Sequence, residues 1–362
     1  MQNGQYNEPA TASGPLLSVR ELQTYFYQDE GVVKAVDGAS FDVLSGKTLG
    51  IVGESGCGKS VTARSILRIV EAPGRIVGGQ ILFRPNSLGQ SRGSGGQVDL
   101  TRFRADSDQM RAIRGAQIGL VFQEPMTSFS PVHTIGNQIV EQITTHEPMT
   151  KRNAREKAVD LLRQVGVSRP AQRLDEYPYQ LSGGIRQRAM IAMALSCDPM
   201  LLIADEPTTA LDVTTQAQIL DLLRQLQDSR NMAILLITHN LGVVAEMATD
   251  VVVMYLGRVV ERGPVDDIFH DPRHPYTRAL LSSMPSLTAE TRRRLPTISG
   301  SIPHPYQRPR GCPFHPRCPS FMPGTCDTAE PELLAVSDRQ AVSCFLYGGR
   351  DDRRARVAGE VI

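Results

Sequence analysis

Gly53-Glu54-Ser55-Gly56-Cys57-Gly58-Lys59-Ser60 has the phosphate-loop pattern of Gly, four residues, Gly, Lys and Ser, which predicts a loop between a strand and a helix. Residues 47–52 (KTLGIV) before it are typical of a short buried strand. Residues after it lie at the spacing of one helix face, namely Val61, Ile66, Leu67 and Val70. Backbone N–H groups and a helix N-terminus at such a turn form an anion site. The stretch therefore predicts a bound nucleotide triphosphate, with Lys59 at the outer phosphates and the Ser60 hydroxyl on magnesium.

The length and charge of the whole chain limit the class of protein. With 362 residues, the chain exceeds one typical domain, so we expect one large domain and a smaller one. Its net charge of +1 disfavours a general nucleic-acid binder, which usually carries a basic excess. We find no basic segment followed by an apolar core near the start, and no long uncharged apolar stretch. We therefore expect a cytosolic protein with no membrane span of its own.

The first hundred residues are predicted to be rich in strands. Residues 1–15 are polar and contain Gly and Pro, which is typical of a flexible tail. Strands are expected over residues 16–27, 32–35, 39–43 and 78–83. Residues 85–97 (PNSLGQSRGSGGQ) are a Gly/Ser-rich insert that predicts a surface loop without chemistry of its own.

Polar residues with catalytic chemistry follow three apolar strands, which are predicted over residues 117–122, 200–204 and 232–237. Gln123 follows the first, and its amide oxygen suits magnesium or an attacking water. Asp205 and Glu206 follow the second, where one carboxylate can hold magnesium and the other can polarise a water. Two unpaired acids there would be costly to bury without a cation or donors. His239 follows the third; taken alone, a histidine at a strand end is typical of a structural or capping role.

Ser182, Gly183 and Gly184 begin a predicted helix that runs to Leu195. The two glycines leave backbone N–H groups bare, which suits an anion, although an ordinary capped helix start explains the pattern equally well. Further helices are expected over 134–145 and 152–165, and a β-hairpin over 251–262 that turns at Leu256-Gly257.

Taken together and in this order, these segments resemble the ATP-binding cassette (ABC) ATPases over residues 17 to about 265. The elements that carry the resemblance are Gly53 to Ser60, Gln123, 181–187 (LSGGIRQ), 201–206 (LLIADE), 210–212 (ALD) and His239. The resemblance implies an α/β fold: a RecA-like core with an antiparallel β subdomain and an α-helical subdomain at about 125–195. All of these parts would lie within residues 16–270.

Roles in hydrolysis also follow from the resemblance. Glu206 would be the general base for the attacking water, His239 would contact the γ-phosphate, and Lys59 would complete the catalytic set. Magnesium would be bound by Ser60, Gln123 and Asp205. Gln123 would also couple the core to the helical subdomain.

Other residues would complete the ATP site, one by stacking on the adenine base and others by coming from a second subunit. The family places its adenine-stacking aromatic at Phe26, with Tyr25 and Tyr27 as alternatives. The signature residues Ser182, Gly183 and Gly184 of one subunit would face the phosphate loop of another, because charge must be stabilised on all sides of the γ-phosphate. Asp212 belongs to the loop that crosses this dimer interface.

Four strings carry a closer resemblance, to ATP-binding subunits of the dipeptide/oligopeptide/nickel importer family. They are residues 121–131 (VFQEPMTSFSP), 274–287 (HPYTRALLSSMPSL), 295–303 (LPTISGSIP) and 311–318 (GCPFHPRC). This resemblance implies a small Cys-rich C-terminal extension over 271–346, followed by a flexible tail at 347–362. It also implies ATP hydrolysis that powers uptake of dipeptides or oligopeptides across the cytoplasmic membrane. Nickel or oligosaccharide import is an alternative within the family, and a non-transport regulatory ABC ATPase is an alternative of another class.

The same resemblance implies a set of partners. These are a second ABC ATPase subunit, favoured as a related chain over a second copy, two membrane permease subunits and an extracytoplasmic substrate-binding protein. No nucleic-acid partner is expected. The chain would lie peripherally on the cytoplasmic face of the inner membrane, and residues 124–134 would dock on the permeases.

The C-terminal extension contains four of the six cysteines, Cys312, Cys318, Cys326 and Cys344, in a Pro-rich context with little helical or strand pattern. In a cytosolic protein such cysteines are typical of thiols or metal ligands rather than disulfides. The spacing lacks the paired C-x-x-C of a zinc ribbon. The resemblance associates this extension with a [4Fe-4S] cluster of structural role; zinc and free thiols are the alternatives.

Overall fold

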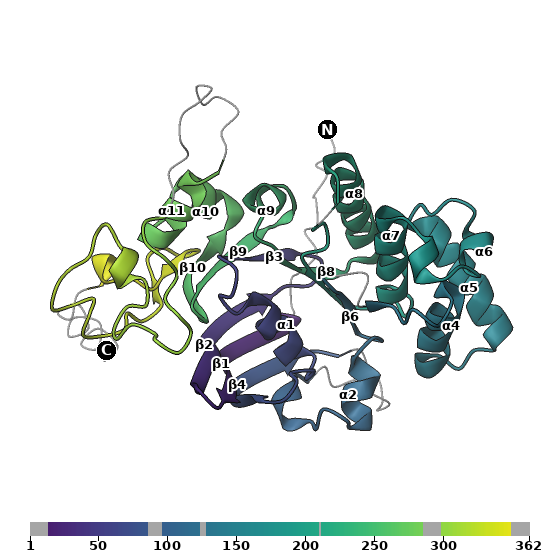
Figure 1. Cartoon of the computed structure of the whole chain (residues 1–362), viewed down its shortest axis with the longest axis horizontal. Coiled ribbons are helices and arrows are strands. Elements are labelled where there is room, and N and C mark those ends of the chain that lie inside the picture. Colours follow the sequence, from purple (N-terminus) through teal and green to yellow (C-terminus); the bar gives the residue numbers. More distant parts are fainter. Residues whose placement is uncertain (1–13, 86–95, 124–127, 210, 285–297, 349–362) are drawn as a thin grey trace, which may run out of the picture.

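The computed structural model describes residues 14–85, 96–123, 128–209, 211–284 and 298–348. Within these ranges the strands form one sheet of eight and one of four, and Figure 1 shows a cluster of helices at one end and the C-terminal extension at the other. Most of the predicted tails (1–15 and 347–362) and of the Gly/Ser insert (85–97) lies outside the described residues.

The eight-stranded sheet has a parallel centre and a strand order of β11-β12-β10-β9-β3-β8-β7-β6. Its parallel strands are β3 (Thr48–Val52), β6 (Ile118–Val121), β7 (Leu201–Asp205), β8 (Ala233–Ile237) and β9 (Asp250–Tyr255). All residues of β3, β7 and β8 are buried, which explains why the sequence shows continuous apolar runs there. Because these three strands run in parallel, the residues that follow them lie together at the C-terminal ends of the strands.

The four-stranded sheet is antiparallel and has the order β2-β1-β4-β5. Its strands are β1 (Leu17–Gln28), β2 (Gly31–Val43), β4 (Gly74–Phe83) and β5 (Val98–Asp99). Buried Leu22, Phe41 and Ile81 of this sheet share a core cluster with Ile66 of helix α1 (Lys59–Ile66). The two strands predicted over 32–35 and 39–43 are one continuous strand, because the whole of β2 pairs with β1.

The helix after the phosphate loop is shorter than predicted. It ends at Ile66, and Leu67 is its C-cap residue. The next residue, Arg68, has φ of 56°, which a right-handed helix does not accommodate. Ile69 and Val70 therefore lie beyond the helix, although their spacing continues its apolar face.

The helical subdomain contains α4 (Ile135–His146), α5 (Lys151–Gln164), α6 (Pro170–Arg173) and α7 (Gly183–Ala194) (Figure 1). Thr134 and Thr150 cap the first two, each accepting a backbone N–H at 3.3 Å. Buried Ile139 and Ile143 of α4 share a cluster with Leu162 of α5. Further α-helices before residue 250 include α2 (Asp108–Ile113), α8 (Val213–Arg230) and α9 (Leu241–Met247). Across the described ranges, no helix combines the length and the apolar character that a membrane crossing requires.

The C-terminal part adds strands to the central sheet. Strand β10 (Arg258–Pro264) forms the predicted hairpin with β9, and the turn at Leu256 and Gly257 has φ of 43° and 80°. Two strands follow that the sequence did not predict, β11 (Leu334–Ala335) and β12 (Ala341–Val342). Strand β12 pairs with β10, so the central sheet crosses the predicted boundary at residue 271. Other short elements within the described residues are α10 (Val265–His270), α11 (Pro275–Ser282) and the 3-10 turns Leu100–Arg102, Pro178–Gln180, His315–Arg317 and Phe345–Tyr347.

Buried Glu261 of β10 anchors the C-terminal extension. Its carboxylate accepts the backbone N–H groups of Arg273 and His274 at 2.6 and 2.9 Å, and the Gln340 side chain at 2.9 Å. Burial raises its pKa, an effect that these donors oppose. One carboxylate thus ties the start of α11 and the β11–β12 hairpin to the sheet.

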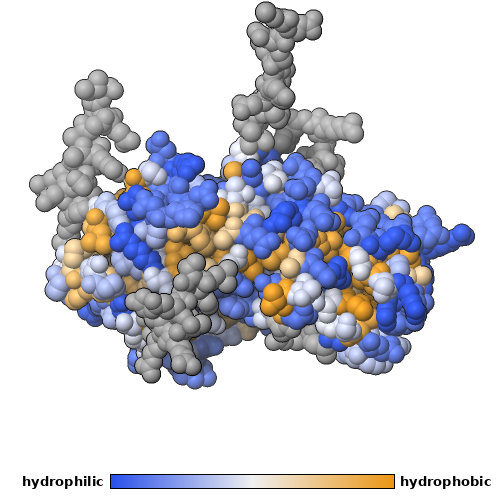
Figure 2. Space-filling view, turned by 90° about the horizontal axis from the view of Figure 1, so that it is seen from above, coloured by the Kyte–Doolittle hydropathy of each residue, from blue (hydrophilic) through white to orange (hydrophobic). Residues whose placement is uncertain are grey.

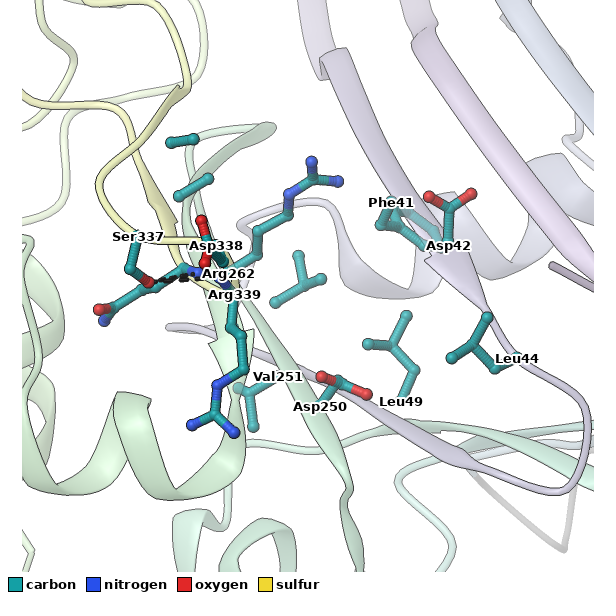
Figure 3. A pocket seen from close by; sticks show the side chains of 15 residues that line it. Phe41, Asp42, Leu44, Leu49, Asp250, Val251, Arg262, Ser337, Asp338 and Arg339 are labelled. Atoms are coloured by element: carbon teal, nitrogen blue, oxygen red, sulfur yellow. Dashed lines mark hydrogen bonds between the residues drawn. The ribbon is translucent and has the colours of Figure 1, made fainter. Parts of the chain in front are cut away.

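A cavity of about 350 Å³ lies where this hairpin meets the N-terminal ends of β3 and β9 (Figure 3). Leu49, Asp250 and Arg262 are among the side chains that line it. Since the phosphate loop follows the opposite, C-terminal end of β3, this cavity is not the nucleotide site.

Candidate functional site

The phosphate loop connects the end of β3 to the start of α1, as predicted. Gly53, Gly56 and Gly58 have φ of 152°, 79° and 102°, a region that residues with a Cβ rarely adopt. A Cβ at Gly53 would lie 2.2 Å from the carbonyl oxygen of Met254, and one at Gly58 would lie 2.2 Å from that of Ala35. Strands β9 and β2 therefore enclose the loop so closely that only glycine fits at both positions.

Lys59 and Ser60 open α1, and both side chains point to loop or strand-end atoms. Lys59 is buried, and its Nζ donates to the carbonyl oxygens of Gly53 and Glu54 at 2.8 and 3.1 Å. The Ser60 hydroxyl donates to Oδ1 of Asp205 at 3.0 Å. The first turn of α1 holds no acidic residue that would compete with a bound anion.

Asp205 ends β7 and is only 8% exposed. Burial raises the pKa of this carboxyl, and the hydrogen bond from Ser60 acts in the opposite direction. Mg²⁺ in nucleotide sites is bound by oxygen ligands, and a serine hydroxyl beside a buried carboxylate supplies two of them. Two of the three predicted magnesium ligands thus lie together and fit the ion.

Glu206 is the centre of a hydrogen-bond network at the same strand ends. Its carboxylate contacts Nδ1 of His239 at 3.0 Å and accepts Thr209 Oγ1 at 2.8 Å and Gln123 Nε2 at 3.2 Å. Burial acts to raise its pKa, but the donors, led by His239, hold the pKa below its ordinary value. The residue has φ of 49°, a strained value for glutamate that its backbone bond to Ile237 helps to maintain.

The structure thus joins the predicted residues in pairs. Glu206 and His239 lie together, whereas Gln123, predicted as a magnesium ligand, donates its amide N–H to Glu206. Their roles in hydrolysis stay predictions, but a carboxylate held ionised by donors beside a buried Asp205–Ser60 pair is suited to activating a water near a bound metal.

The signature lies at the start of α7, with Ser182 at the N-cap position. Ser182 makes no capping bond with its side chain, and both it and Gly183 are exposed. A Cβ on Gly183 would meet nothing within 4 Å in this chain. Figure 1 shows α7 well to the side of α1. Asp212 caps α8, accepting the N–H of Thr215 at 2.9 Å.

The three candidate aromatics for adenine have different surroundings in β1. Phe26 is half-buried and packs on β4, since a Cβ on Gly74 would lie 2.6 Å from its ring. The Tyr25 hydroxyl donates to Asp37 at 2.5 Å, and Tyr27 is 46% exposed. The adenine role of Phe26 stays a prediction.

A cavity of about 340 Å³ borders the phosphate loop at Gly56. Its walls come from residues 32–35 of β2 and from the C-terminal extension, including Tyr306 and Arg308. Arg308 pairs with Asp37 of β2 at 2.6 Å. The extension therefore contributes to the surroundings of the loop, which the sequence did not predict.

The cysteines of the extension do not form the expected metal site. All six cysteines of the chain are free. Cys312 and Cys326 are buried in an apolar cluster, and burial together with neighbouring thiols raises the pKa of Cys312 to about 12. In the described part of the chain, no group of three or more His, Cys, Asp or Glu side chains is arranged to hold a metal ion. The predicted [4Fe-4S] cluster is therefore not supported by this geometry.

Sequence reasoning missed three residues at the site. Thr209 donates to Glu206, and Tyr276 and Arg317 of the extension both contact Glu54 of the phosphate loop. Tyr276 and Arg317 lie within strings 274–287 and 311–318 that carried the family resemblance, but nothing in those strings indicated what the side chains contact.

A phosphate loop beside two carboxylates at the C-terminal end of one parallel strand defines a nucleoside triphosphatase of the phosphate-loop class. Comparison with known families agrees with this class. Residues 36–209 match the family described as ABC transporter, and residues 260–326 match the oligopeptide/dipeptide transporter C-terminal region.

Curated relatives span nearly the same length. The oligopeptide transport ATP-binding protein AppD of Bacillus subtilis is 50% identical over 333 residues, which cover 92% of this chain and 97% of that protein. The dipeptide transport ATP-binding protein DppD of Escherichia coli is 46% identical over 329 residues, which cover 91% and 96%. The chain therefore belongs to the ATP-binding proteins of ABC transporters, in the oligopeptide/dipeptide group, and is an ATPase of that family.

Solved structures agree on the fold. The dimeric MJ0796, a bacterial ABC transporter cassette, has a TM-score of 0.59 at 23% identity, covering 69% of this chain and 98% of that one. CbiO1 of Clostridium perfringens has a TM-score of 0.57 at 25% identity, covering 72% and 92%. The predicted fold, a RecA-like core with an antiparallel β subdomain and a helical subdomain, is confirmed.

Proposed function

We propose that this chain hydrolyses ATP to power the import of dipeptides or oligopeptides across the cytoplasmic membrane. The observation that carries the catalytic part is the Glu206–His239 contact next to the Asp205–Ser60 pair. The peptide part rests on relatives: AppD and DppD are named for oligopeptide and dipeptide transport.

Within this proposal the residues of the site divide the work. Bound ATP offers Lys59 charged phosphate oxygens, which are stronger acceptors than the two loop carbonyls that it contacts here. Ser60 and Asp205 would hold Mg²⁺, which supplies charge neutralisation on the phosphates. Glu206 would take the proton of the attacking water, and His239 would keep its carboxylate oriented.

A second ATPase subunit would complete the site. Exposed Ser182 and Gly183 open α7 with an uncapped helix N-terminus, and no side chain of the described residues fills the space beside Gly183. A phosphate group of another subunit's nucleotide has the charge and size for that position. We favour a related chain as the partner over a second copy.

Permease subunits are the partners that an ABC transporter ATPase implies, and we propose a peripheral position on the cytoplasmic face of the inner membrane. Figure 2 shows apolar side chains breaking the hydrophilic surface on the side of the helical subdomain. Val132 is 73% exposed and Tyr179 is 62% exposed, and the ring of Tyr179 stacks on that of Tyr177 with their centroids 5.6 Å apart. Val132 lies in the predicted docking segment, of which residues 124–127 are outside the described ranges.

A metal centre on the four cysteines of the extension remains a proposal on donor chemistry alone, because the packing described above does not assemble it. Iron and acid-labile sulfide measured on protein purified without oxygen would support a [4Fe-4S] cluster. Zinc at one equivalent, or no metal with four titratable thiols, would replace it with one of the alternatives.

The proposed function is tested in the assembled transporter. The chain is purified with its membrane subunits, and ATP hydrolysis is measured with the binding protein empty or loaded with dipeptide, oligopeptide, a nickel chelate or an oligosaccharide. We expect stimulation by a peptide. Stimulation by nickel or oligosaccharide alone would change the cargo, and turnover indifferent to every partner would favour a regulatory ATPase.

A further inference from the structure

The C-terminal extension contacts the phosphate loop directly, through the second residue of the loop. Glu54 donates its backbone N–H to the hydroxyl of Tyr276 at 2.8 Å. Its carboxylate accepts two hydrogen bonds from the guanidinium of Arg317, at 2.7 Å on Oε2 and 3.0 Å on Oε1. Both partners come from beyond residue 271, outside the segment that carries the loop and the catalytic acids.

Arg317 is fixed by several acceptors at once. Besides the two bonds to Glu54, its Nε donates to the carbonyl of Ser299 at 3.0 Å and Nη1 to the hydroxyl of Tyr255 at 3.3 Å. Its side chain is 4% exposed and that of Glu54 is 21% exposed. The hydrogen bond to Glu54 and the other contacts raise the pKa of Arg317 despite burial. A bidentate, largely buried pair of this kind has one defined geometry.

Tyr276 and Arg317 stand on a rigid aromatic platform. The rings of Tyr255 and Tyr276 are 4.7 Å apart, and Phe314 lies 5.3 Å from the first and 5.4 Å from the second. All three rings are buried. Tyr255 ends β9, whose neighbour β3 leads into the loop. Because these rings are packed together and buried, the extension holds the Tyr276 hydroxyl and the Arg317 guanidinium at fixed positions beside Glu54.

The negative charge of Glu54 connects this contact with nucleotide binding. The carboxylate belongs to a loop whose backbone N–H groups receive the anionic phosphates of ATP, so an unpaired charge there would repel the nucleotide. Arg317 neutralises the charge and turns it toward the extension. Removing one partner of a buried pair leaves the other charge uncompensated, and the penalty here would fall on the nucleotide site.

We propose that Arg317 and Tyr276 are positioning residues of the ATP site, through which the C-terminal extension sets nucleotide affinity. They act on Glu54 and do not touch the nucleotide. The proposal rests on the proposed ATP site at the phosphate loop. It assigns to the extension a task in ATP binding that neither its sequence strings nor the resemblance indicated.

The test is the dissociation constant for ATP with Mg²⁺, measured by calorimetry on the full chain. We expect Arg317→Met to weaken binding by about tenfold or more, because the Glu54 charge is then bare. The double variant Glu54→Gln/Arg317→Met lacks that charge and should recover most of the affinity. In steady state, the Arg317→Met variant should show a raised KM for ATP with kcat little changed. The matched control is Arg339→Met, which breaks another extension pair, with Asp267 at 2.7 Å, away from the loop.

The double variant separates charge compensation from a merely structural role. If Arg317 only docks the extension, the double variant stays as weak as Arg317→Met, and the proposal is overturned; wild-type affinity in folded Arg317→Met overturns it as well. If Arg317→Met does not fold, Tyr276→Phe decides, since it keeps the ring and removes only the hydroxyl bonded to the loop. A few-fold loss of affinity there supports the proposal, and unchanged affinity refutes it. A wild-type chain that binds no ATP refutes the proposed function itself.

Discussion

The substitution Glu206→Gln tests the catalytic network most directly. It removes one negative charge and keeps the size of the side chain. In the structure the two carboxylate oxygens receive His239, Thr209 and Gln123, and a glutamine retains one acceptor oxygen for these donors. The network should therefore persist while the ability to take a proton is lost.

The expected magnitude follows from that loss. A positioned general base contributes about 10²- to 10⁴-fold to a rate. At 1.36 kcal/mol per factor of ten, this is about 3–5 kcal/mol of barrier. The donors hold the pKa of Glu206 below its ordinary value, so the wild-type carboxylate is ionised at neutral pH and the full effect should appear. ATP binding should be retained, because Glu206 lies outside the phosphate loop.

Phosphate release by the assembled transporter measures the effect, with ATP affinity measured in parallel. The control is Glu246→Gln, an exposed carboxylate that pairs with Arg224 on the surface, and it should leave turnover unchanged. A Glu206→Gln variant that hydrolyses ATP within about fivefold of the wild type would refute the base assignment, since a general base typically contributes at least about 10²-fold.

Three further outcomes follow from the same geometry. Asp205→Asn should abolish most of the gain in ATP affinity that Mg²⁺ provides, because the buried anionic oxygen beside Ser60 is lost. ATP titrations of the variant with and without Mg²⁺ that differ in affinity as much as those of the wild type would contradict this. Gly53→Ala should abolish ATP binding in a chain that still folds, since its Cβ would lie 2.2 Å from the Met254 carbonyl oxygen, and calorimetric affinity near wild type would count against the enclosed loop. Burial raises the pKa of Glu261 above its ordinary 4.5, so the folded chain holds that proton more tightly than the unfolded chain. This stabilisation is complete below pH 4.5 and is lost as pH rises through the raised pKa of Glu261. The urea midpoint of the wild type should therefore fall over that pH window, whereas that of Glu261→Gln should not. Plots of urea midpoint against pH that run parallel for the two proteins would disprove this.

The central fold could be predicted because its signals are local and strong. Buried parallel strands are continuous apolar runs, so β3, β7 and β8 were recognisable, and with β7 the two acids at its end. The phosphate loop is specified by glycines whose φ values other residues avoid. The helix after the loop was overextended because the apolar spacing continues past Ile66, whereas its end is set by the backbone at Arg68.

The rest depends on contacts between distant segments, which leave no periodic pattern. Strands β11 and β12 have two residues each, too few to show alternation. They form because β12 pairs with β10 on one side and with β11 on the other. The Glu54–Arg317 pair joins residues 263 positions apart. The family resemblance and the Pro-rich context of the four cysteines suggested a metal, yet three of these cysteines pack with the apolar residues of the C-terminal core.

The pairing of β12 with β10 also covers an edge of the central sheet at which another molecule of this protein could pair. Without it, β10 would be an edge strand, and the backbone groups of Glu261 and Arg262, next to buried Val259 and Val260 of the same strand, would lack their present partners. Such an edge is a template for intermolecular pairing. A chain that stopped near residue 270 would keep every predicted catalytic residue and expose this edge, so we expect it to self-associate more readily than the full chain.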